Sequence, residues 1–128
     1  MLFPSHDQVK VSGTTSPYPS NQRFNHTDNR LTYTGALTRT FEVQATASLT
    51  CLSQNGRQVG LYLAKNGVPI NESEAYTRTA NSGDLVSSTI IYALELVPGD
   101  YIEVFIENFD NNRDLLVEYM NVICKALK

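Results

Sequence analysis

The side chains that most often carry out enzymatic chemistry are few in this sequence and poorly placed for it. The only histidines are His6 and His26. Both lie in a stretch rich in Ser, Thr, Asn and Pro, where a histidine-activated serine or cysteine would lack a rigid support. No glycine-rich phosphate loop, paired-cysteine zinc spacing or His-x-x-x-His pair occurs. The sequence therefore predicts no catalytic residue and no cofactor, and we expect a protein that is not an enzyme.

One acidic pair and one Asp/Asn-rich segment remain as candidates for chemistry. Glu103 and Glu107 share one face of an expected strand and lie about 13 Å apart at the rise of a strand, which is too far for a glycosidase pair. Asp110, Asn112 and Asp114 place oxygen ligands at alternate positions, as a calcium-binding loop does. The glycine and the distant glutamate of that motif are absent. A plain Asn/Asp loop is therefore favoured over a calcium site.

The two cysteines, Cys51 and Cys124, are each aligned with apolar neighbours at a strand-like spacing. A small core accepts a free thiol as a compact apolar side chain, so free buried thiols are the favoured interpretation. The alternative is one disulfide between two sheets, which would require an oxidising compartment.

The charge balance bears on the choice of partner. Thirteen acidic residues against ten basic ones give a net charge of −3, and the basic residues are scattered singly. This argues against nucleic acid or an anionic membrane as a partner. The first residues do not have the pattern of an export signal, and no apolar run approaches the length of a membrane span. We expect neither nucleic acid nor a membrane as a partner.

The chain changes composition near residue 30. Residues 1–29 hold three prolines and few large apolar side chains, so they cannot enclose a core and are expected to form an extended N-terminal arm. Within the arm, Val9 and Val11 could add an edge strand, and Phe24 could dock on the rest of the protein. Residues 30–128 form the expected domain, because turn residues there separate runs of alternating polarity.

These alternating runs predict β-strands. In the clearest one, apolar side chains occupy every second position: Phe41, Val43, Ala45, Ala47, Leu49 and Cys51. A helical period would scatter these side chains around the circumference. Further strands are expected after the Asn55-Gly56 turn, at 68–70 beyond the Asn66-Gly67 hairpin, and at 75–79, 86–96, 101–107 and 115–127. About eight strands without an amphipathic helix predict an all-β, two-sheet antiparallel jelly-roll sandwich.

Some of these strands are apolar on both faces. Tyr101 and Phe105 alternate with the aliphatic residues of their strand, and the run 90–94 is apolar throughout. Because the sequence predicts no helix to cover a second apolar face, we expect a subunit interface. Aromatic side chains anchor interfaces at little entropic cost. The candidate interface residues are Tyr62, Tyr92, Tyr101, Phe105 and Tyr119.

Several segments between residues 29 and 123 carry a resemblance to a known family. They are residues 30–35 (RLTYTG), 38–41 (TRTF), 61–67 (LYLAKNG) and 96–104 (LVPGDYIEV), followed by Glu107 and Asn108. In this order and spacing they resemble the jelly-roll domains of the C1q and tumour-necrosis-factor type. More closely, they are similar to the short versions of that domain found among virion structural proteins of tailed bacteriophages.

This resemblance implies a jelly roll of ten or nearly ten strands, a tight homotrimer, and a role in binding. Animal members have collagen stalks or secretion signals, which this chain lacks, so the viral branch is favoured. The resemblance then implies a location at the virion surface, as a capsid decoration or cement protein or an appendage knob. The arm would attach it to capsid or other virion proteins. The alternative is a receptor- or glycan-binding module that contacts a host-surface glycan through loops near residues 81–84 and 108–114.

Overall fold

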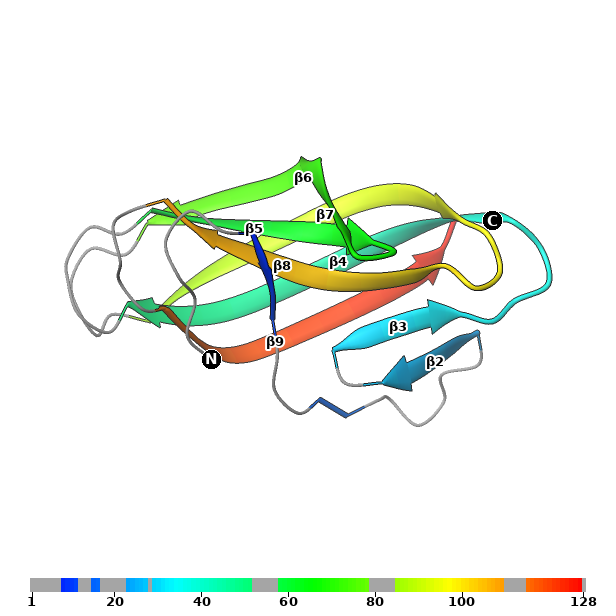
Figure 1. The fold of residues 1–128 in the computed structure, drawn as a ribbon, viewed down its shortest axis with the longest axis horizontal. Coiled ribbons are helices and arrows are strands. Elements are labelled where there is room, and N and C mark those ends of the chain that lie inside the picture. The colour runs from blue at the N-terminus through cyan, green and yellow to red at the C-terminus, as the bar shows by residue number, and fades with distance from the viewer. Residues whose placement is uncertain are drawn as a thin grey trace.

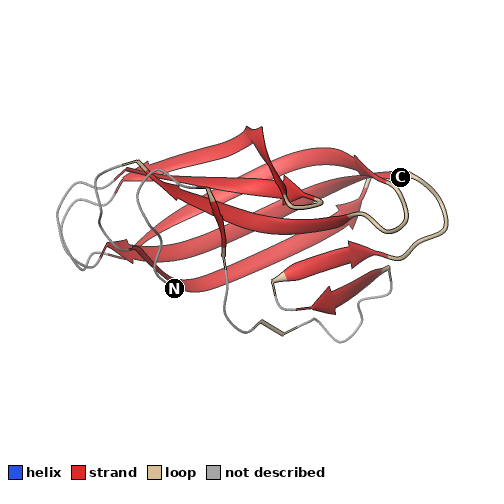
Figure 2. Ribbon diagram, viewed as in Figure 1, coloured by secondary structure: helices blue, strands red, loops and turns tan. Residues whose placement is uncertain are grey.

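The computed structural model describes residues 8–11, 15–16, 23–27, 29–51, 58–78, 85–109 and 115–127. These residues form nine β-strands and no helix (Figure 1, Figure 2). The strands are β1 (Val9–Lys10), β2 (Phe24–Thr27), β3 (Arg30–Tyr33), β4 (Arg39–Cys51), β5 (Gln58–Lys65), β6 (Val68–Arg78), β7 (Leu85–Leu96), β8 (Tyr101–Asn108) and β9 (Leu115–Ala126). Accordingly, none of the described segments is a helix that could cross a membrane. The predicted all-β class is confirmed.

The strands form two antiparallel sheets that pack face to face (Figure 1). Sheet A has the order β2-β3-β8-β5-β6, and β1 also pairs with β8. Sheet B has the order β7-β4-β9. Its central strand β4 is paired on both sides along nearly its whole length, which leaves β9 as an edge strand of the sandwich.

The core lies between the sheets and follows the alternation of the sequence. On β4 the odd-numbered side chains from Phe41 to Leu49 are at most 1% exposed, and the intervening ones point to the other face of the sheet. Sheet A contributes the buried side chains of Val59, Leu61, Leu63, Ile102, Val104 and Ile106. Full burial of each such aliphatic side chain stabilises the fold by about 1.5–3 kcal/mol, so these layers hold the sheets together.

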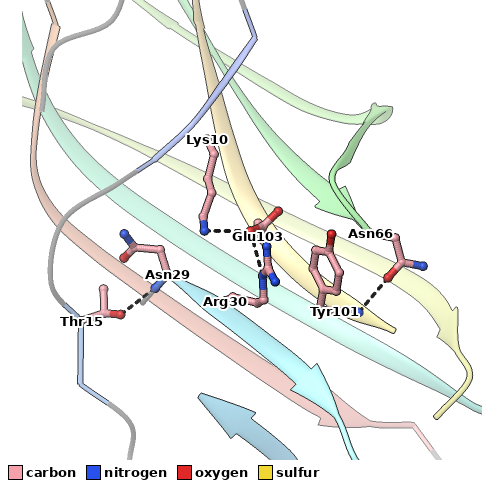
Figure 3. Close-up of polar contacts among 7 residues, drawn as sticks. All are labelled: Lys10, Thr15, Asn29, Arg30, Asn66, Tyr101 and Glu103. Atoms are coloured by element: carbon pink, nitrogen blue, oxygen red, sulfur yellow. Dashed lines mark hydrogen bonds and ion pairs between the residues drawn. The ribbon is translucent and has the colours of Figure 1, made fainter. Parts of the chain in front are cut away.

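Two turns at one end of the sandwich are joined by side-chain hydrogen bonds. Asn66 and Gly67 connect β5 to β6 with φ angles of 53° and 82°, which confirms the expected Asn-Gly hairpin. Gly99, in the turn between β7 and β8, has a φ of 96°. The Asn66 amide donates to Asp100 Oδ1 at 2.9 Å, and its oxygen accepts from the backbone N–H of Tyr101 at 3.0 Å (Figure 3).

The Asp100 carboxylate in this junction has a lowered pKa. Burial by itself raises the pKa, but hydrogen bonds from the Asn66 side chain and the Val97 backbone, together with the charge of Lys65, outweigh burial. The Lys65 Nζ lies 3.5 Å from Asp100 Oδ2. Because the ionised form is favoured, the carboxylate acts as a hydrogen-bond acceptor that fixes both turns.

Strand β6 differs from the sequence-based expectation of two short strands at 68–70 and 75–79. It is one strand whose pairing with β5 shifts register between Leu61 and Leu63. The buried hydroxyl of Ser73 accepts from the backbone N–H of Leu63 at 2.9 Å and donates to the carbonyl of Ile70 at 2.6 Å. This side chain satisfies backbone groups that the irregular ladder would leave unpaired, so the strand continues across the shift.

Two stretches of the expected arm are strands of sheet A. β1 pairs with β8, and the backbone N–H of Val11 donates to the carbonyl of Val104 at 2.9 Å. β2 pairs with β3, and the ring of Phe24 lies 5.6 Å from that of Tyr33 and 5.3 Å from that of Phe41. The described part of residues 1–29 is therefore packed onto the domain of residues 30–128.

Thr15 fixes the chain between these two strands. Its hydroxyl lies 2.7 Å from His26 Nε2 on β2 and accepts from the backbone N–H of Asn29 at 3.0 Å (Figure 3). Asn29 has a φ of 57° in the turn that leads into β3. His26 thus has a structural contact that helps to hold Thr15 against β2.

The positions of the cysteines rule out the disulfide that the sequence left open. Cys51 and Cys124 both belong to sheet B, where Cys51 pairs with Leu115 and Cys124 pairs with Val43. Eight residues of β4 separate these two pairs, which corresponds to about 26 Å along the strand. A disulfide requires Cα atoms less than about 7 Å apart, and Cys124 is a free thiol.

Candidate functional site

Three of the five candidate interface aromatics lie together on the outward side of sheet A, here called the sheet A face. On β5, Tyr62 lies between the core residues Leu61 and Leu63, so it points away from the core. Tyr101 and Phe105 point the same way from β8, and Phe105 is directly opposite Tyr62 in the register. The structure therefore brings Tyr62, Tyr101 and Phe105 onto one surface.

The ring of Tyr62 is only 3% exposed, although it lies on the outward side of the sheet. Its hydroxyl lies between two carboxylates: it contacts Glu74, and it is 3.0 Å from Glu107 Oε1. Gly60 stands beside it, and a Cβ there would lie 3.1 Å from the Tyr62 ring. A side chain at this position would require the ring to shift by a few tenths of an ångström, so glycine fits best here. Because it is covered, Tyr62 presents little area to a neighbouring molecule.

Glu103 forms a buried charge cluster on the same face. Its carboxylate Oε2 is 2.8 Å from Lys10 Nζ of β1 and 3.1 Å from Arg30 Nε of β3 (Figure 3). The Glu103 side chain is 3% exposed, whereas those of Lys10 and Arg30 are 33% and 38% exposed. The Arg30 guanidinium also lies 3.9 Å from the centre of the Tyr101 ring. These contacts attach β1 and β3 to β8.

The other two candidate aromatics lie elsewhere. Tyr92 is opposite Val43 in the register, so it points inward, and it packs against both clusters of the core. Tyr119 is opposite Ser48, points outward from sheet B, and is 71% exposed. The five aromatics are thus divided among the sheet A face, the core and the outside of sheet B.

The outward side of sheet B has four rows of paired residues without a charged side chain. We call these rows the sheet B face. Across β7, β4 and β9 they are Leu85, Thr50 and Leu116; Ser87, Ser48 and Tyr119; Thr89, Thr46 and Asn121; and Ile91, Gln44 and Ile123. Ile91 is 64% exposed and Ile123 is 53% exposed. The exposed Glu118 of β9 lies between the first two rows, at the register shift where it has no partner position on β4. Within the paired rows, charged residues begin only beyond the last row, at Glu42 and Lys125.

Sequence reasoning missed Ile91 and Ile123 as surface residues. Both stand in runs that are apolar at consecutive positions, so alternation alone does not say which member points outward. The register with β4 decides it, because both residues are opposite the outward-pointing Gln44. The outward-pointing Gln44 on the central strand is therefore the sequence feature that predicts which apolar residues of the neighbouring strands point outward.

A second missed feature is an aromatic pair near one end of sheet A. Tyr76 of β6 is 59% exposed, and its ring lies 5.3 Å from that of Phe109 at a tilt of 44°. A hydrogen bond with Glu74 raises the pKa of Tyr76, with smaller contributions from burial and from the charges of Glu74 and Glu107. The pair thus combines two rings with two nearby carboxylates.

The calcium candidate Asp110, Asn112 and Asp114 lies outside the described residues. Among the residues that the structure does describe, no group of three or more His, Cys, Asp or Glu side chains could hold a metal ion. Glu103 and Glu107, the acidic pair on β8, are engaged with Lys10 and Arg30 and with Tyr62, respectively.

No model of a known protein family matches the chain, and no curated protein matches it. Solved structures do share its fold. Murine APRIL has a TM-score of 0.60 over 97% of this chain and 95% of its own, at 13% identity. Eiger TNF from S. frugiperda has a TM-score of 0.54 over 97% and 89%, at 14% identity. The globular domain of zebrafish complement 1qA has a TM-score of 0.44 over 93% of each chain, at 16% identity.

The first two of these comparisons establish the fold of the chain. It is an all-β sandwich of two antiparallel sheets with the jelly-roll architecture of the tumour-necrosis-factor type. The fold that the sequence resemblance implied is confirmed. The described residues contain nine strands, close to the ten that the resemblance implied.

Proposed function

We propose that this protein is a non-enzymatic binding and assembly domain that forms a closed homotrimer at the surface of a virus particle. The trimer is proposed to use the sheet B face of one copy against a different surface of the next copy. The remaining surfaces and the N-terminal segment then contact other virion proteins.

The single observation that carries this proposal is the character of the sheet B face. Soluble sandwiches place charged side chains on the outward side of their sheets. Here the four rows carry none, and four large side chains in them are each more than half exposed: Leu85, Ile91, Tyr119 and Ile123. A surface with aromatic and aliphatic anchors and a single charged side chain, Glu118, has a composition close to that of an interface core.

The chemistry of the two outward faces supports a ring. The sheet A face holds buried charges and hydrogen-bonded aromatics, whereas the four rows of the sheet B face hold none and have the single carboxylate of Glu118 beside them, so the two faces are not equivalent. Contacts between non-equivalent surfaces are heterologous, and they close into a ring when the rotation between copies allows it. The resemblance of residues 30–108 to C1q and tumour-necrosis-factor domains supports three copies in that ring.

The trimer is tested by placing charges on the sheet B face. Lysine at both positions in Ile91→Lys/Ile123→Lys would put like charges in a desolvated contact. We expect the double variant to be monomeric by light scattering at low micromolar concentration, with unchanged circular dichroism. Val68→Lys is the matched control, because Val68 is 66% exposed but lies at the β5–β6 hairpin. A trimeric double variant would contradict the proposed contact.

The virion role is supported by the resemblance to phage structural proteins and by the arm. Val11 and Phe24 are part of the core, so a deletion of residues 1–20 would remove a strand as well as an attachment segment. Truncation of residues 1–7 alone leaves β1 in place. We expect this truncated protein to remain trimeric and to lose binding to purified particles in a sedimentation assay. Undiminished binding would argue against attachment through these residues.

Glycan binding is the second candidate function, and the Tyr76–Phe109 pair favours it. Proteins recognise sugars by stacking them on aromatic rings and by hydrogen bonds with a few polar groups, and the carboxylates of Glu74 and Glu107 can accept hydrogen bonds from sugar hydroxyls here. Under this alternative, Tyr76→Ala abolishes binding to host-surface polysaccharide measured by calorimetry, whereas Tyr119→Ala does not. Particle binding that survives Tyr76→Ala and is lost on truncation of residues 1–7 would favour the virion role.

A further inference from the structure

The side chains around the Tyr76–Phe109 pair converge above Gly60 of β5. Gly60 alternates with buried core residues, so its outward side belongs to the sheet A face. Its register partners are Tyr76 on β6 and Glu107 on β8, because β5 lies between those two strands (Figure 1). Since Gly60 contributes no side chain, the residues around it can lean over it.

Two aromatic rings and one carboxylate meet at this position. A Cβ on Gly60 would lie 3.0 Å from Glu74 Oε2 and 3.0 Å from the Phe109 ring. The centre of the Phe109 ring is 5.3 Å from that of Tyr76, which is 59% exposed. Glu74, Tyr76 and Phe109 therefore lie within reach of one small ligand, although Phe109 comes from the segment after β8.

The carboxylate of Glu74 is held by neutral groups. It accepts hydrogen bonds from the hydroxyls of Tyr62 and Tyr76. A carboxylate has about four acceptor positions, so two hydroxyls leave positions for a ligand. Among the described residues, no lysine or arginine forms an ion pair with Glu74. This partly exposed carboxylate can therefore attract a cation.

The electrostatic field at the Tyr76 ring is negative. The hydrogen bond with Glu74 raises the pKa of Tyr76, and burial and the charges of Glu74 and Glu107 raise it further. Arg78 lies two positions beyond Tyr76 on the same side of β6, but it is exposed, so solvent screens its charge. The repulsion that disfavours a tyrosinate here would equally disfavour an anionic ligand.

These features together select a class of ligand. Aromatic rings stack against the C–H face of a sugar, and the face of a ring also attracts a nearby cation. A sugar with a protonated amine matches both the rings and Glu74. A sialic or uronic acid would instead place its carboxylate beside Glu74 and Glu107.

We propose that the Tyr76–Phe109 site binds a protonated amino sugar, with the sugar ring on the aromatic pair and the ammonium group at Glu74. This inference rests on glycan binding, the second candidate function, and names the class of glycan. It requires no reaction and no cofactor.

The proposal is tested by calorimetry with three tetrasaccharides at about pH 6, below the pKa of an amine of this kind. They are the tetramers of glucosamine, N-acetylglucosamine and galacturonic acid, which are cationic, neutral and anionic. We expect the glucosamine tetramer to bind about tenfold more tightly than the acetylated one, and the galacturonic acid tetramer not to bind. Similar affinities for the first two, or a preference for the third, would overturn the amino-sugar assignment and leave glycan binding in place. Binding of none of the three would overturn the proposal and also argue against glycan binding at this pair.

A charge-neutralising variant shows whether the preference comes from Glu74. In Glu74→Gln the amide keeps the shape and loses the charge, so the affinity for the glucosamine tetramer should fall to that for the acetylated one. Glu118→Gln removes the same charge from β9 on the other sheet and is the matched control. An equal loss of affinity in Glu118→Gln would indicate non-specific attraction to an acidic chain and would overturn the proposal.

The position of the ligand is tested in the unaltered protein, so it does not depend on the folding of a variant. On titration with the glucosamine tetramer, the ring resonances of Tyr76 and Phe109 should shift in NMR spectra, whereas that of the exposed Tyr119 should not. Shifts confined to Tyr119 would overturn the assignment of the site.

Discussion

The buried carboxylate of Glu103 joins three segments that are distant in the sequence. Its two cationic partners come from β1 and β3, and both are about one third exposed. Removing one charge from a fully buried ion pair leaves the other charge without a partner, which costs about 3–5 kcal/mol of stability. Solvent screening of Lys10 and Arg30 reduces that figure.

We therefore expect Glu103→Gln to lower the free energy of unfolding by about 1–2 kcal/mol, since the amide keeps the shape and loses the charge. Urea denaturation measures this change in the free energy of unfolding. The matched control is Glu118→Gln, at an exposed position on β9, which should change stability by less than about 0.5 kcal/mol. Equal effects of the two substitutions would contradict a stabilising role for the Glu103 cluster.

Asp100 should make stability dependent on acid pH. Its pKa is lowered in the folded protein, so it stabilises the fold above the pKa of the unfolded chain. That contribution is lost as the pH falls through the lower, folded pKa. In Asp100→Asn we expect a smaller decline of the melting temperature between neutral pH and about pH 3. An unchanged slope relative to the unaltered protein would argue against this linkage.

Among the strands, β6 depends on one buried hydroxyl. Ser73→Ala would leave the Leu63 N–H without an acceptor and the Ile70 carbonyl without this donor. An unsatisfied buried group costs about 1–3 kcal/mol, and we expect a loss of that size in urea denaturation. Ser87→Ala, at an exposed position on β7, should be nearly neutral. A neutral Ser73→Ala would mean that the register shift does not depend on this side chain.

The strands themselves were accessible to sequence reasoning because alternation is local. The run from Phe41 to Cys51 and the Asn66-Gly67 hairpin follow from period and turn chemistry alone. The sequence does not predict that β6 is continuous. Its continuity depends on the Ser73 hydroxyl, which forms hydrogen bonds to backbone groups of β5 and β6 at the register shift. The placement of the aromatics was only partly accessible: alternation separates neighbouring side chains, but only the pairing of β7 with β4 shows that Tyr92 points inward.

For the molecule as a whole, long-range pairing creates the features that sequence could not predict. The sheet B face arises because β7 and β9 both flank β4, which aligns Ile91 and Ile123 across Gln44. A cleft between the two sheets, lined by residues of β2, β3, β4 and β9, arises because the edge strand β9 lies opposite β2 and β3. Those two strands come about 90 residues earlier in the chain. Neither arrangement has a local signature, whereas the jelly-roll class follows from the number and spacing of the strands.

The solution mass tests the account most directly, because self-assembly through the sheet B face is its central claim. Light scattering at low micromolar concentration should give three times 14.3 kDa, about 43 kDa. A mass of 14.3 kDa would contradict the account, since the exposed Ile91, Tyr119 and Ile123 would then not mediate contact between copies of this chain.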